Sequence, residues 1–404
     1  MKIRKGDCEL LTHKNNMSYV WNLPTKVLFG AGQIKRLIRE EFPGKKALVV
    51  ISSGNSVREN GSLQILEKIL EDKQLEYYIF DKINSNPGDK VLEEAILFCK
   101  ENQCDFVIGL GGGSVIDAAT VIAALAPQNT FEIWEYIAGG SGKGKKMDNP
   151  SLPYIAITTS AGTGSEVDCW GVVTNSNTHE KIALQCSYPM LAVIDPELMI
   201  TVPSDYTAYQ GFDALFHNIE GYLSRFANEA SEMMELEAIR NIAQYLPIAI
   251  KEGDNIVART KIAYASVLGG YSMELSSCIS QHAIEHVMSG YHEKLSHGAG
   301  LLMISNSYFA LWIEKHVCDD RFIKLAKVLG MKEATEPEDF LKALDKLKRE
   351  CNVNKLKMSD YGIQSDEFVN MAKEAKVTMK SLFFNDRVRV TEENIVKILE
   401  ESYL

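Results

Sequence analysis

The chain has 404 residues and a formal net charge of -11, with 46% hydrophobic and 24% charged residues. This composition is typical of a globular protein, and the negative charge argues against nucleic-acid binding. No apolar run approaches the ~18 residues that a membrane helix needs, and a chain of this length predicts two domains.

The first 18 residues carry positive charge but no apolar segment behind it, so we expect an N-terminal arm at 1–18 rather than a secretory signal. The eight cysteines are scattered and form no C-x-x-C pattern. Such spacing is typical of free thiols in a reducing compartment, and it predicts a cytoplasmic protein.

Residues 19–198 alternate short β-rich runs with helical segments. Strands are predicted at 46–52, 77–80, 106–109, 154–158 and 192–194, and helices at 33–41, 63–75, 91–102 and 115–125. This alternation indicates βαβ units. It therefore predicts an α/β domain whose parallel sheet has helices on both faces.

A glycine run follows the third predicted strand. Gly111, Gly112 and Gly113 precede a helix that Ser114 is placed to cap. Glycines let a diphosphate approach the backbone N–H groups at a helix N-terminus. A tight turn that binds nothing is the alternative, but three glycines exceed what a turn needs. The run is not a G-x-G-x-x-G fingerprint, so an ordinary Rossmann domain is doubtful.

A second polar turn, 158–166, follows the strand predicted at 154–158 and is rich in hydroxyl groups and glycines. Ligands of open α/β sheets bind at the carboxyl ends of the strands. Two such turns predict a dinucleotide, with one turn at its diphosphate and the other towards its nicotinamide.

The strand pattern disappears from about residue 199. Helical spacing is found at 206–225, 230–252, 256–274, 277–289, 301–315 and 319–329, and again at 337–349, 365–375 and 391–401. Residues 199–404 are therefore predicted to form an all-α domain.

Four of the eight histidines fall within residues 281–300: His282, His286, His292 and His297. His282 and His286 are four residues apart, so on a helix they would share one face. Such a pair could be solvated or part of the core, but a divalent metal is the simplest use for it.

Asp213 and His217 have the same spacing on an earlier predicted helix. Alone, Asp213 would be interpreted as a helix cap. With His282 and His297 it completes a set of one carboxylate and three imidazoles, which suits Fe²⁺, Zn²⁺ or Mn²⁺ and leaves room for a substrate oxygen. A dinucleotide beside such a metal predicts hydride transfer to or from a metal-bound oxygen.

These motifs, in this order, resemble the iron-containing (group III) alcohol dehydrogenases. The resemblance runs from about Tyr19 and rests on 23–30, 86–87, 111–117, 158–166, 195–196, 211–217 and 282–298. It implies the dehydroquinate-synthase-like architecture of an α/β nucleotide-binding domain and an all-helical metal-binding domain. It also implies a metal-dependent, NAD(P)-linked alcohol dehydrogenase or aldehyde reductase that acts on CH–OH groups of small alcohols, as a homodimer or larger oligomer.

By matching position, the resemblance implies metal ligands at Asp213, His217, His282 and His297, and His286 as a candidate proton relay. It places the cofactor against Asn86, Gly111, Gly112, Gly113, Ser114, Asp117, Thr158, Thr159, Thr163, Ser165 and Lys181. It places Trp170, Met273 and Phe383 at the substrate pocket.

The nucleotide preference turns on Gly54. Family members that prefer NAD tend to carry an acidic residue at this position, where a carboxylate bonds the ribose 2′-OH. The small turn at 51–56 would not repel a 2′-phosphate, so NADP(H) is favoured over NAD(H). The motif 117–120 also lacks the lysine that is common in relatives.

Two other functions are weighed. His282, Glu285 and His286 fit the H-x-x-E-H pattern of inverted zinc proteases, but a protease would leave both glycine turns without a role. Glu285 is therefore expected to be a surface or outer-sphere carboxylate. A non-redox enzyme of the same nucleotide-and-metal fold is the second alternative, although its ligands use a different motif.

Overall fold

The computed structural model describes residues 18–403, so the arm predicted at 1–18 lies outside them except for its last residue. The N-terminal half is built on a six-stranded parallel sheet. In spatial order its strands are β1 (Lys26–Phe29), β8 (Leu191–Ile194), β5 (Tyr154–Thr158), β4 (Phe106–Gly111), β2 (Lys46–Ser52) and β3 (Glu76–Ile83). β2 and β4 are buried along nearly their whole length, the pattern of a parallel sheet covered on both sides.

The chain order reverses next to β2. β3 pairs with one edge of β2, and β4, which follows β3 in the chain, pairs with the other edge. In open α/β sheets, ligands bind beyond the carboxyl ends of the strands at such a switch point. The glycine run follows β4 and therefore lies beside this position. It comes after the fourth strand in the chain, because β1 precedes those that were predicted.

Helices cover both faces of the sheet. The 3₁₀ helix η1 (Gln33–Arg39), α1 (Ser56–Glu59) and α2 (Ser62–Asp72) pack on one face, and α3 (Asp89–Glu101) and α4 (Gly113–Leu125) pack on the other. Every residue of α4 from Val115 to Leu125 is buried, because the helix lies between the sheet and a second layer. That layer is an antiparallel ribbon of β6 (Trp170–Thr174) and β7 (Lys181–Gln185).

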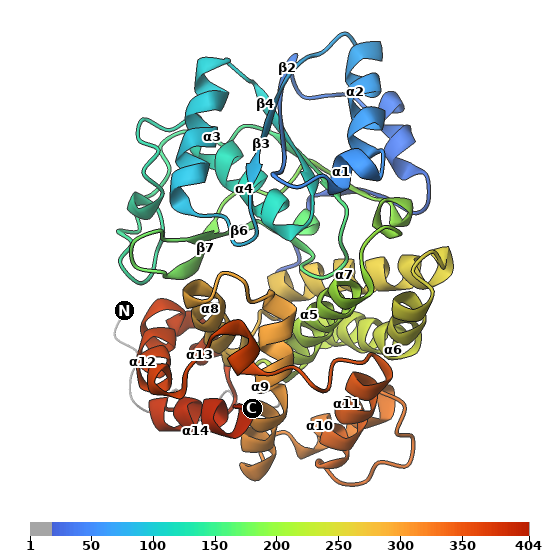
Figure 1. Cartoon of the computed structure of the whole chain (residues 1–404), viewed down its shortest axis with the longest axis vertical. Coiled ribbons are helices and arrows are strands. Elements are labelled where there is room, and N and C mark those ends of the chain that lie inside the picture. Colours follow the sequence, from blue (N-terminus) through green and yellow to red (C-terminus); the bar gives the residue numbers. More distant parts are fainter. Residues whose placement is uncertain (1–17, 404) are drawn as a thin grey trace.

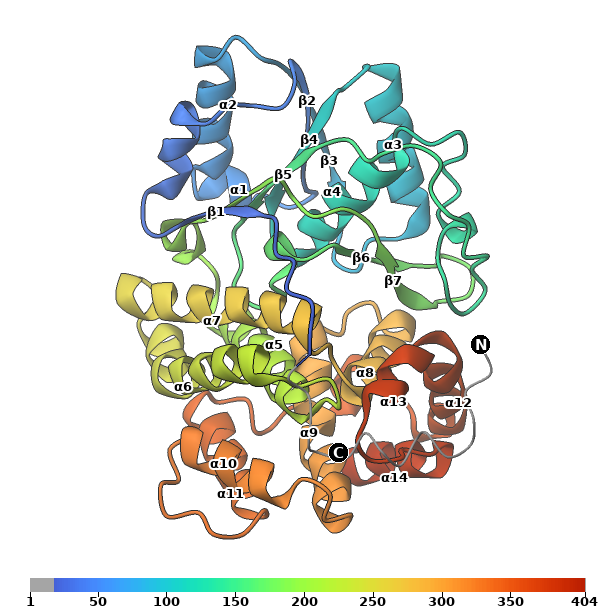
Figure 2. The same cartoon turned by 180° about the vertical axis from the view of Figure 1, so that it is seen from behind.

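The second half is helical. It contains α5 (Ser204–Leu223), α6 (Glu229–Lys251), α7 (Ile256–Leu275), α8 (Ser280–Tyr291), α9 (His297–Glu314), α10 (Asp319–Val328), α11 (Asp339–Glu350), α12 (Phe368–Thr378), α13 (Lys380–Asn385) and α14 (Glu392–Ser402). Short 3₁₀ helices occur in both halves: η2 (Ile133–Glu135), η3 (Ser165–Val167) and η4 (Pro196–Met199) precede α5, and η5 (Met358–Tyr361) and η6 (Ser365–Glu367) follow α11. In Figures 1 and 2 the sheet and its helices occupy one half of the molecule, and α5 to α14 occupy the other.

The helix α5 is central to this second half. It packs against α6, α7 and α9, and all its residues from Gly211 to Leu223 are buried. Phe212 and Phe216 direct one side of α5 into the helical core, where the ring of Phe216 stacks on Phe309 at 6.2 Å between centroids.

The predicted fold class is confirmed. The predicted strands and helices are present, with their ends displaced by a few residues. The ribbon β6–β7 and the helix α13 were not predicted, because these short segments mix polar and apolar residues and do not form the continuous apolar runs by which the buried strands were recognised. Within residues 18–403 no helix combines the length and the apolarity needed to cross a membrane. We propose that the domain boundary lies at 198/199, inside η4, where the strands have ended and α5 has not begun.

The buried Glu235 of α6 makes the free energy of unfolding of the protein depend on pH. Its Oε1 accepts hydrogen bonds from Ser272 Oγ at 2.7 Å and Ser276 Oγ at 2.6 Å, while Oε2 has no partner. Burial raises the pKa of this carboxyl from 4.5 to about 7, and the two serines oppose the rise. Because the pKa is raised in the folded state, the stabilisation is complete below pH 4.5 and is lost as the pH rises to about 7.

We predict that Glu235→Gln removes this dependence, because the amide stays neutral. Between about pH 5 and about pH 8, the unfolding free energy of the wild type should fall by roughly 2 to 3 kcal/mol more than that of the variant. Urea denaturation at both pH values measures the difference. Glu237→Gln changes a half-exposed carboxylate on the same helix and should keep the wild-type behaviour. Parallel pH profiles for all three proteins would contradict the prediction.

Candidate metal centre and cofactor cavity

Three helices bring the four candidate ligands together. Asp213 and His217 lie four residues apart in the middle of α5, so consecutive turns place them on one face; Asp213 is therefore not a helix cap. His282 lies in the first turn of α8, and His297 is the first residue of α9. The cluster therefore depends on the packing of α5 against the starts of two later helices.

The Asp213 carboxylate lies among the three imidazoles. Its Oδ1 atom is 3.7 Å from His217 Nδ1 and 3.8 Å from His282 Nε2. The same oxygen is 3.5 Å from His297 Nε2. The rings of His217 and His282 are stacked, with centroids 4.5 Å apart. The nitrogens thus surround the oxygen at distances too long for ordinary hydrogen bonds.

Two buried atoms of this cluster lack a hydrogen-bond partner: Asp213 Oδ1 and His282 Nε2. An unsatisfied buried polar atom costs about 1–3 kcal/mol, and native proteins leave few of them. A divalent cation bound by both atoms would satisfy both at once. The residues therefore fit a metal ion, which supplies a positive charge and a site for an oxygen ligand.

Carboxylates contact two of the histidine rings at Nδ1, the nitrogen that faces away from Asp213. His282 Nδ1 is 2.5 Å from Glu220 Oε1, and His297 Nδ1 is hydrogen-bonded to Glu285 Oε2. Glu220 and Glu285 are fully buried. A carboxylate oxygen can only accept here, so each Nδ1 carries a hydrogen and each Nε2 is the ring nitrogen that faces Asp213. Such outer carboxylates are typical of metal-binding histidines.

His217 is held in a similar way, because its Nδ1 donates to the carbonyl oxygen of Gly162 at 3.3 Å. Burial lowers the pKa of His217 to about 3, so its ring is neutral at neutral pH. Burial would raise the pKa of Asp213, but His217 and His297 outweigh it and the net pKa is lowered. The cluster thus combines an ionised carboxylate with a neutral imidazole, which favours a cation between them.

His286 lies beside the cluster rather than in it. Its Nδ1 donates to the carbonyl oxygen of Lys181 at 3.3 Å, and its ring centroid is 5.4 Å from that of His297. Burial, with the charges of Lys181 and His297, holds the pKa of His286 well below its usual range. The more distant His292 bonds Glu367 at 3.2 Å and takes no part in the cluster.

The geometry does not favour the protease alternative. That function needs His282 and His286 to share one ion and Glu285 to activate a water. Among residues 18–403, His282 groups with Asp213 and His297, whereas His286 groups with Glu285 and His297. Glu285 is buried rather than at the surface, and it is already engaged by His297. The expectation that Glu285 lies at the surface is therefore wrong, and its position behind His297 stays compatible with an outer-sphere role.

Two cavities meet at the cluster. The larger, of about 870 Å³, extends from the histidines to the β6–β7 ribbon and α13. The smaller, of about 540 Å³, lies at the switch point of the sheet and is lined by Ser52, Gly112 and Gly113. Both are lined by Asn86, Ser114, Thr163 and His297. One elongated ligand could therefore extend from the switch point to the histidines.

Most of the predicted site residues line these cavities. They are Asn86, Gly112, Gly113, Ser114, Asp117, Thr163, Ser165, Trp170, Lys181, Asp213, His217, Met273, His282, His286 and His297. Five do not: Gly54, Gly111, Thr158, Thr159 and Phe383. Gly54 is exposed, Thr158 Oγ bonds the Ser160 carbonyl at 3.0 Å, and the Phe383 ring packs against Lys376 at 4.0 Å.

The glycine run has a packing role of its own. A Cβ on Gly111 would lie 2.7 Å from the Val115 side chain, and one on Gly113 would lie 2.5 Å from Thr163. Packing therefore requires these two glycines whether or not a phosphate binds. The three consecutive glycines alone thus no longer argue for a diphosphate site. Gly112 is the N-cap of α4, so Ser114 lies inside the helix and does not cap it.

Two ionisable side chains, Asp117 and Lys181, line the larger cavity. Burial raises the pKa of Asp117 to about 7, while Ser165, the Val172 backbone and Lys181 lower it. Lys181 Nζ is 2.9 Å from Ser289 Oγ and is almost fully buried. A buried ammonium and a readily protonated carboxyl give this region polar groups that can orient a nucleotide.

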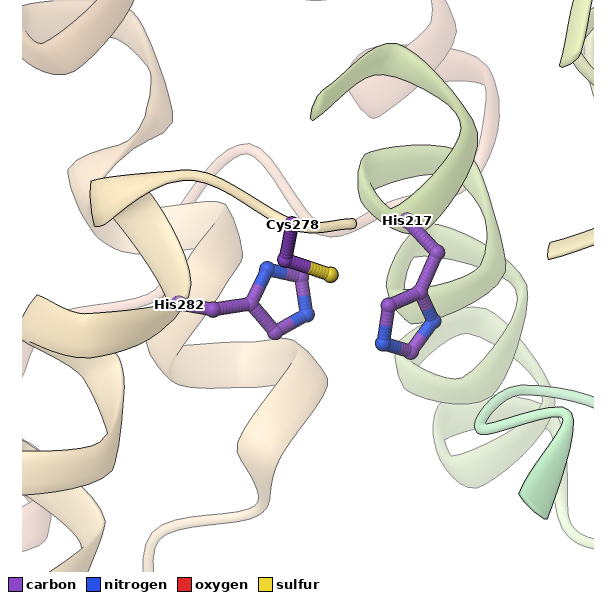
Figure 3. Close-up of side chains that lie close together, drawn as sticks. All are labelled: His217, Cys278 and His282. Atoms are coloured by element: carbon purple, nitrogen blue, oxygen red, sulfur yellow. The ribbon is translucent and has the colours of Figure 1, made fainter. Parts of the chain in front are cut away.

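Glu220 and Cys278 are additional residues of the cluster that the sequence did not single out. Glu220 follows Asp213 and His217 at helical spacing, and Cys278 precedes His282 by four residues. Cys278 lies close to His217 and His282 (Figure 3). Spacing from the predicted ligands was the signal that could have found both residues.

The two halves of the chain match two family models. Residues 24–196 match "Iron-containing alcohol dehydrogenase", and residues 207–403 match "Fe-containing alcohol dehydrogenase family, C-terminal". The chain belongs to the iron-containing alcohol dehydrogenase family. It is accordingly an oxidoreductase of the class that acts on CH–OH groups.

Similar members of the iron-containing alcohol dehydrogenase family span nearly the whole chain. The long-chain primary alcohol dehydrogenase AdhA of Thermoanaerobacter ethanolicus is 31% identical, covering 96% of this chain and 99% of that protein. The NADH-dependent butanol dehydrogenase B of Clostridium acetobutylicum is 30% identical, covering 89% and 93%. The crystal structure of an archaeal Red Sea brine pool alcohol dehydrogenase, ADH/D1, superposes with a TM-score of 0.91 at 28% identity, covering 96% and 100%.

We predict that Glu220→Gln and Glu285→Gln each weaken metal binding about 10- to 100-fold, because a neutral amide makes the attached imidazole a poorer ligand. Chelator competition with Zn²⁺ on metal-free protein measures the affinity. Glu235→Gln is the matched control, since this carboxylate is equally buried but bonds serines only. Unchanged affinity in both test variants would show that these carboxylates do not tune the ligands.

Proposed function

We propose that the protein is a metal-dependent dehydrogenase that transfers hydride between a nicotinamide nucleotide and a small primary alcohol or aldehyde. The observation that carries this proposal is the buried Asp213–histidine cluster at the junction of two cavities. Asp213, His217, His282 and His297 would hold Fe²⁺, or Zn²⁺ in its place. The ion would act as a Lewis acid on the substrate oxygen.

The cofactor is proposed to extend through both cavities. Gly112, Gly113 and Ser114 would contact its diphosphate, because they lie at the N-terminus of α4, where backbone N–H groups are free. Thr163, Ser165 and Lys181 would orient the nicotinamide end near the histidines. Asn86 and Asp117 line the same path. Gly111, Thr158 and Thr159 would support these turns through packing and hydrogen bonds instead of direct contact.

His286 is proposed to transfer a proton during the reaction and to be neutral at rest. Its low pKa makes a lasting positive charge unfavourable, since burial and Lys181 both oppose it. With Nδ1 donating to the Lys181 carbonyl, Nε2 is available to accept a proton and to release it again. This role requires no ionised state of His286 between turnovers.

The substrate is proposed to be an alcohol or aldehyde with an apolar chain. The lining of the larger cavity includes the apolar side chains of Trp170, Val172, Leu184, Met273 and Leu382. Apolar walls reward burial of methylene groups by roughly 0.8 kcal/mol each. Relatives named for long-chain primary alcohols and for butanol support this class of substrate. Phe383 lies outside this lining.

For the nucleotide, we propose that NADP(H) is accepted in preference to NAD(H). The turn after β2 has no carboxylate at Gly54 to repel a 2′-phosphate. The nearest cation, Arg58, is paired with Asp81 at 2.9 Å and is only partly available. The relative from Clostridium acetobutylicum is named for NADH, so support for this preference comes from the turn after β2.

We predict that metal removal abolishes nucleotide oxidation with a panel of short-chain aldehydes, and that Fe²⁺ or Zn²⁺ restores it. His282→Ala should lower kcat by at least about a hundredfold, because the Lewis acid contributes several kcal/mol to the barrier. Absorbance of the reduced nicotinamide follows the reaction. His316→Ala, an exposed histidine outside the cluster, is the control. Equal turnover with and without metal would contradict the proposal.

We predict that Gly54→Asp shifts the ratio of kcat/KM values towards NADH by about tenfold or more, since about 1.4 kcal/mol of repulsion suffices. Steady-state kinetics with NADH and NADPH measure the ratio directly. Asn55→Asp adds the same charge one residue later in the turn and should shift the ratio less. A wild-type enzyme that prefers NADH and is insensitive to Gly54→Asp would overturn the proposed preference.

A further inference from the structure

A cysteine that the family's ligand set does not include lies against the metal cluster. Cys278 belongs to the linker between α7 and α8, four residues before His282. Its sulfur, a His217 ring nitrogen and a His282 ring nitrogen all lie within 4.8 Å of one another. Figure 3 shows the three side chains pointing toward one another from the linker, from α5 and from α8. All three residues are buried, with exposed fractions of 7%, 5% and 4%.

The linker that carries Cys278 is held firmly. Asn385 of α13 donates from Nδ2 to the Cys278 carbonyl and to Ser277 Oγ, both at 2.9 Å. Ile279 N donates to Glu220 Oε2 at 2.8 Å. Ser277 has a φ of 65°, which turns the chain sharply just before Cys278. These contacts fix the backbone on both sides of the cysteine and limit where its sulfur can lie.

A single carboxylate aligns the sulfur and the imidazole. Glu220 accepts from Ile279 N through one oxygen and bonds His282 Nδ1 through the other, at 2.5 Å. The ring of His282 therefore presents Nε2, and that atom is buried without a hydrogen-bond partner. An unsatisfied nitrogen aimed between Cys278 and Asp213 is the second, independent sign that a cation belongs there.

We propose that Cys278 is a metal ligand, which together with His217 and His282 gives the site a sulfur-containing face on the side of the larger cavity. The proposal rests on the proposed function, in that the same histidines must bind a metal at all. Thiolate and imidazole are the ligands that structural and catalytic Zn²⁺ sites favour, whereas carboxylate and imidazole suit Fe²⁺. Cys278 thus biases the site towards Zn²⁺.

The position of the bound ion follows from the same geometry. Cys278 lines only the larger cavity, whereas Asp213 lines only the smaller one. The two ligand groups share His282. An ion bound through Cys278 therefore lies nearer the apolar substrate cavity than one bound through Asp213 and His297. Fe²⁺ and Zn²⁺ would occupy overlapping but different positions in this protein.

Cobalt substitution tests the proposal without relying on turnover. Metal-free full-length protein is loaded with Co²⁺, and its absorption spectrum is recorded together with the bound metal content. We expect a near-ultraviolet thiolate-to-cobalt charge-transfer band in the wild type. Cys278→Ser should bind Co²⁺ but lack the band, and its Zn²⁺ affinity should fall by about tenfold or more relative to its Fe²⁺ affinity. Cys186→Ser removes another thiol of the same cavity and should keep the band.

The outcomes separate this proposal from the proposed function. Wild-type protein that binds Co²⁺ without the charge-transfer band would overturn the role of Cys278 and leave the metal site standing. Wild-type protein that binds no Co²⁺ would overturn both. X-ray absorption of the zinc-loaded wild type needs no variant, so it is independent of how Cys278→Ser folds. One sulfur at about 2.3 Å supports the proposal, and a shell of only nitrogen and oxygen at about 2.0–2.2 Å overturns it.

Discussion

A buried negative charge that only a cation can compensate is the constraint on which this structure depends. Asp213 sits in the middle of α5, in a stretch buried from Gly211 to Leu223, and its Oδ1 has no hydrogen-bond partner. Burying an unpaired carboxylate is expensive, and the three neighbouring imidazoles offer it no direct bond. Glu220 and Glu285 orient the rings of His282 and His297 so that both Nε2 atoms face Asp213.

The fold places two cavities beside the histidine cluster. The sheet reverses its strand order beside β2, which opens the smaller cavity at the carboxyl ends of β2 and β4. The helical half closes over this edge and places the histidines at the point where the two cavities meet. A nucleotide and a substrate can therefore approach the same ion from opposite sides. Neither half alone contains both cavities and the histidine cluster, so the site forms where the two halves meet.

Features of the site could be predicted from the sequence where the residues involved are close together in the chain. Asp213 with His217, and the glycine run after β4, carry local spacing that the sequence displays, and they fall where expected. The role of Glu285 is not local, because it depends on α8 meeting α9, and no period reveals that a carboxylate within H-x-x-E-H turns towards His297. Gly111 and Gly113 were interpreted as phosphate glycines, although contacts with Val115 and Thr163 already require them. Phe383 was placed by resemblance alone, and its ring contacts Lys376 and lies outside the cavity lining.

The linker before α8 also sets an order of events during biosynthesis. Its backbone is held by Asn385, and the first N–H of α8 is bonded at 3.0 Å by the Asp386 carboxylate. Both residues leave the ribosome after every candidate ligand has been synthesised, because chains emerge N-terminus first. The sheet half can form early, but the metal cluster cannot take its final geometry until α13 docks. A nascent chain stalled before residue 385 would lack these contacts to the linker and to the first turn of α8.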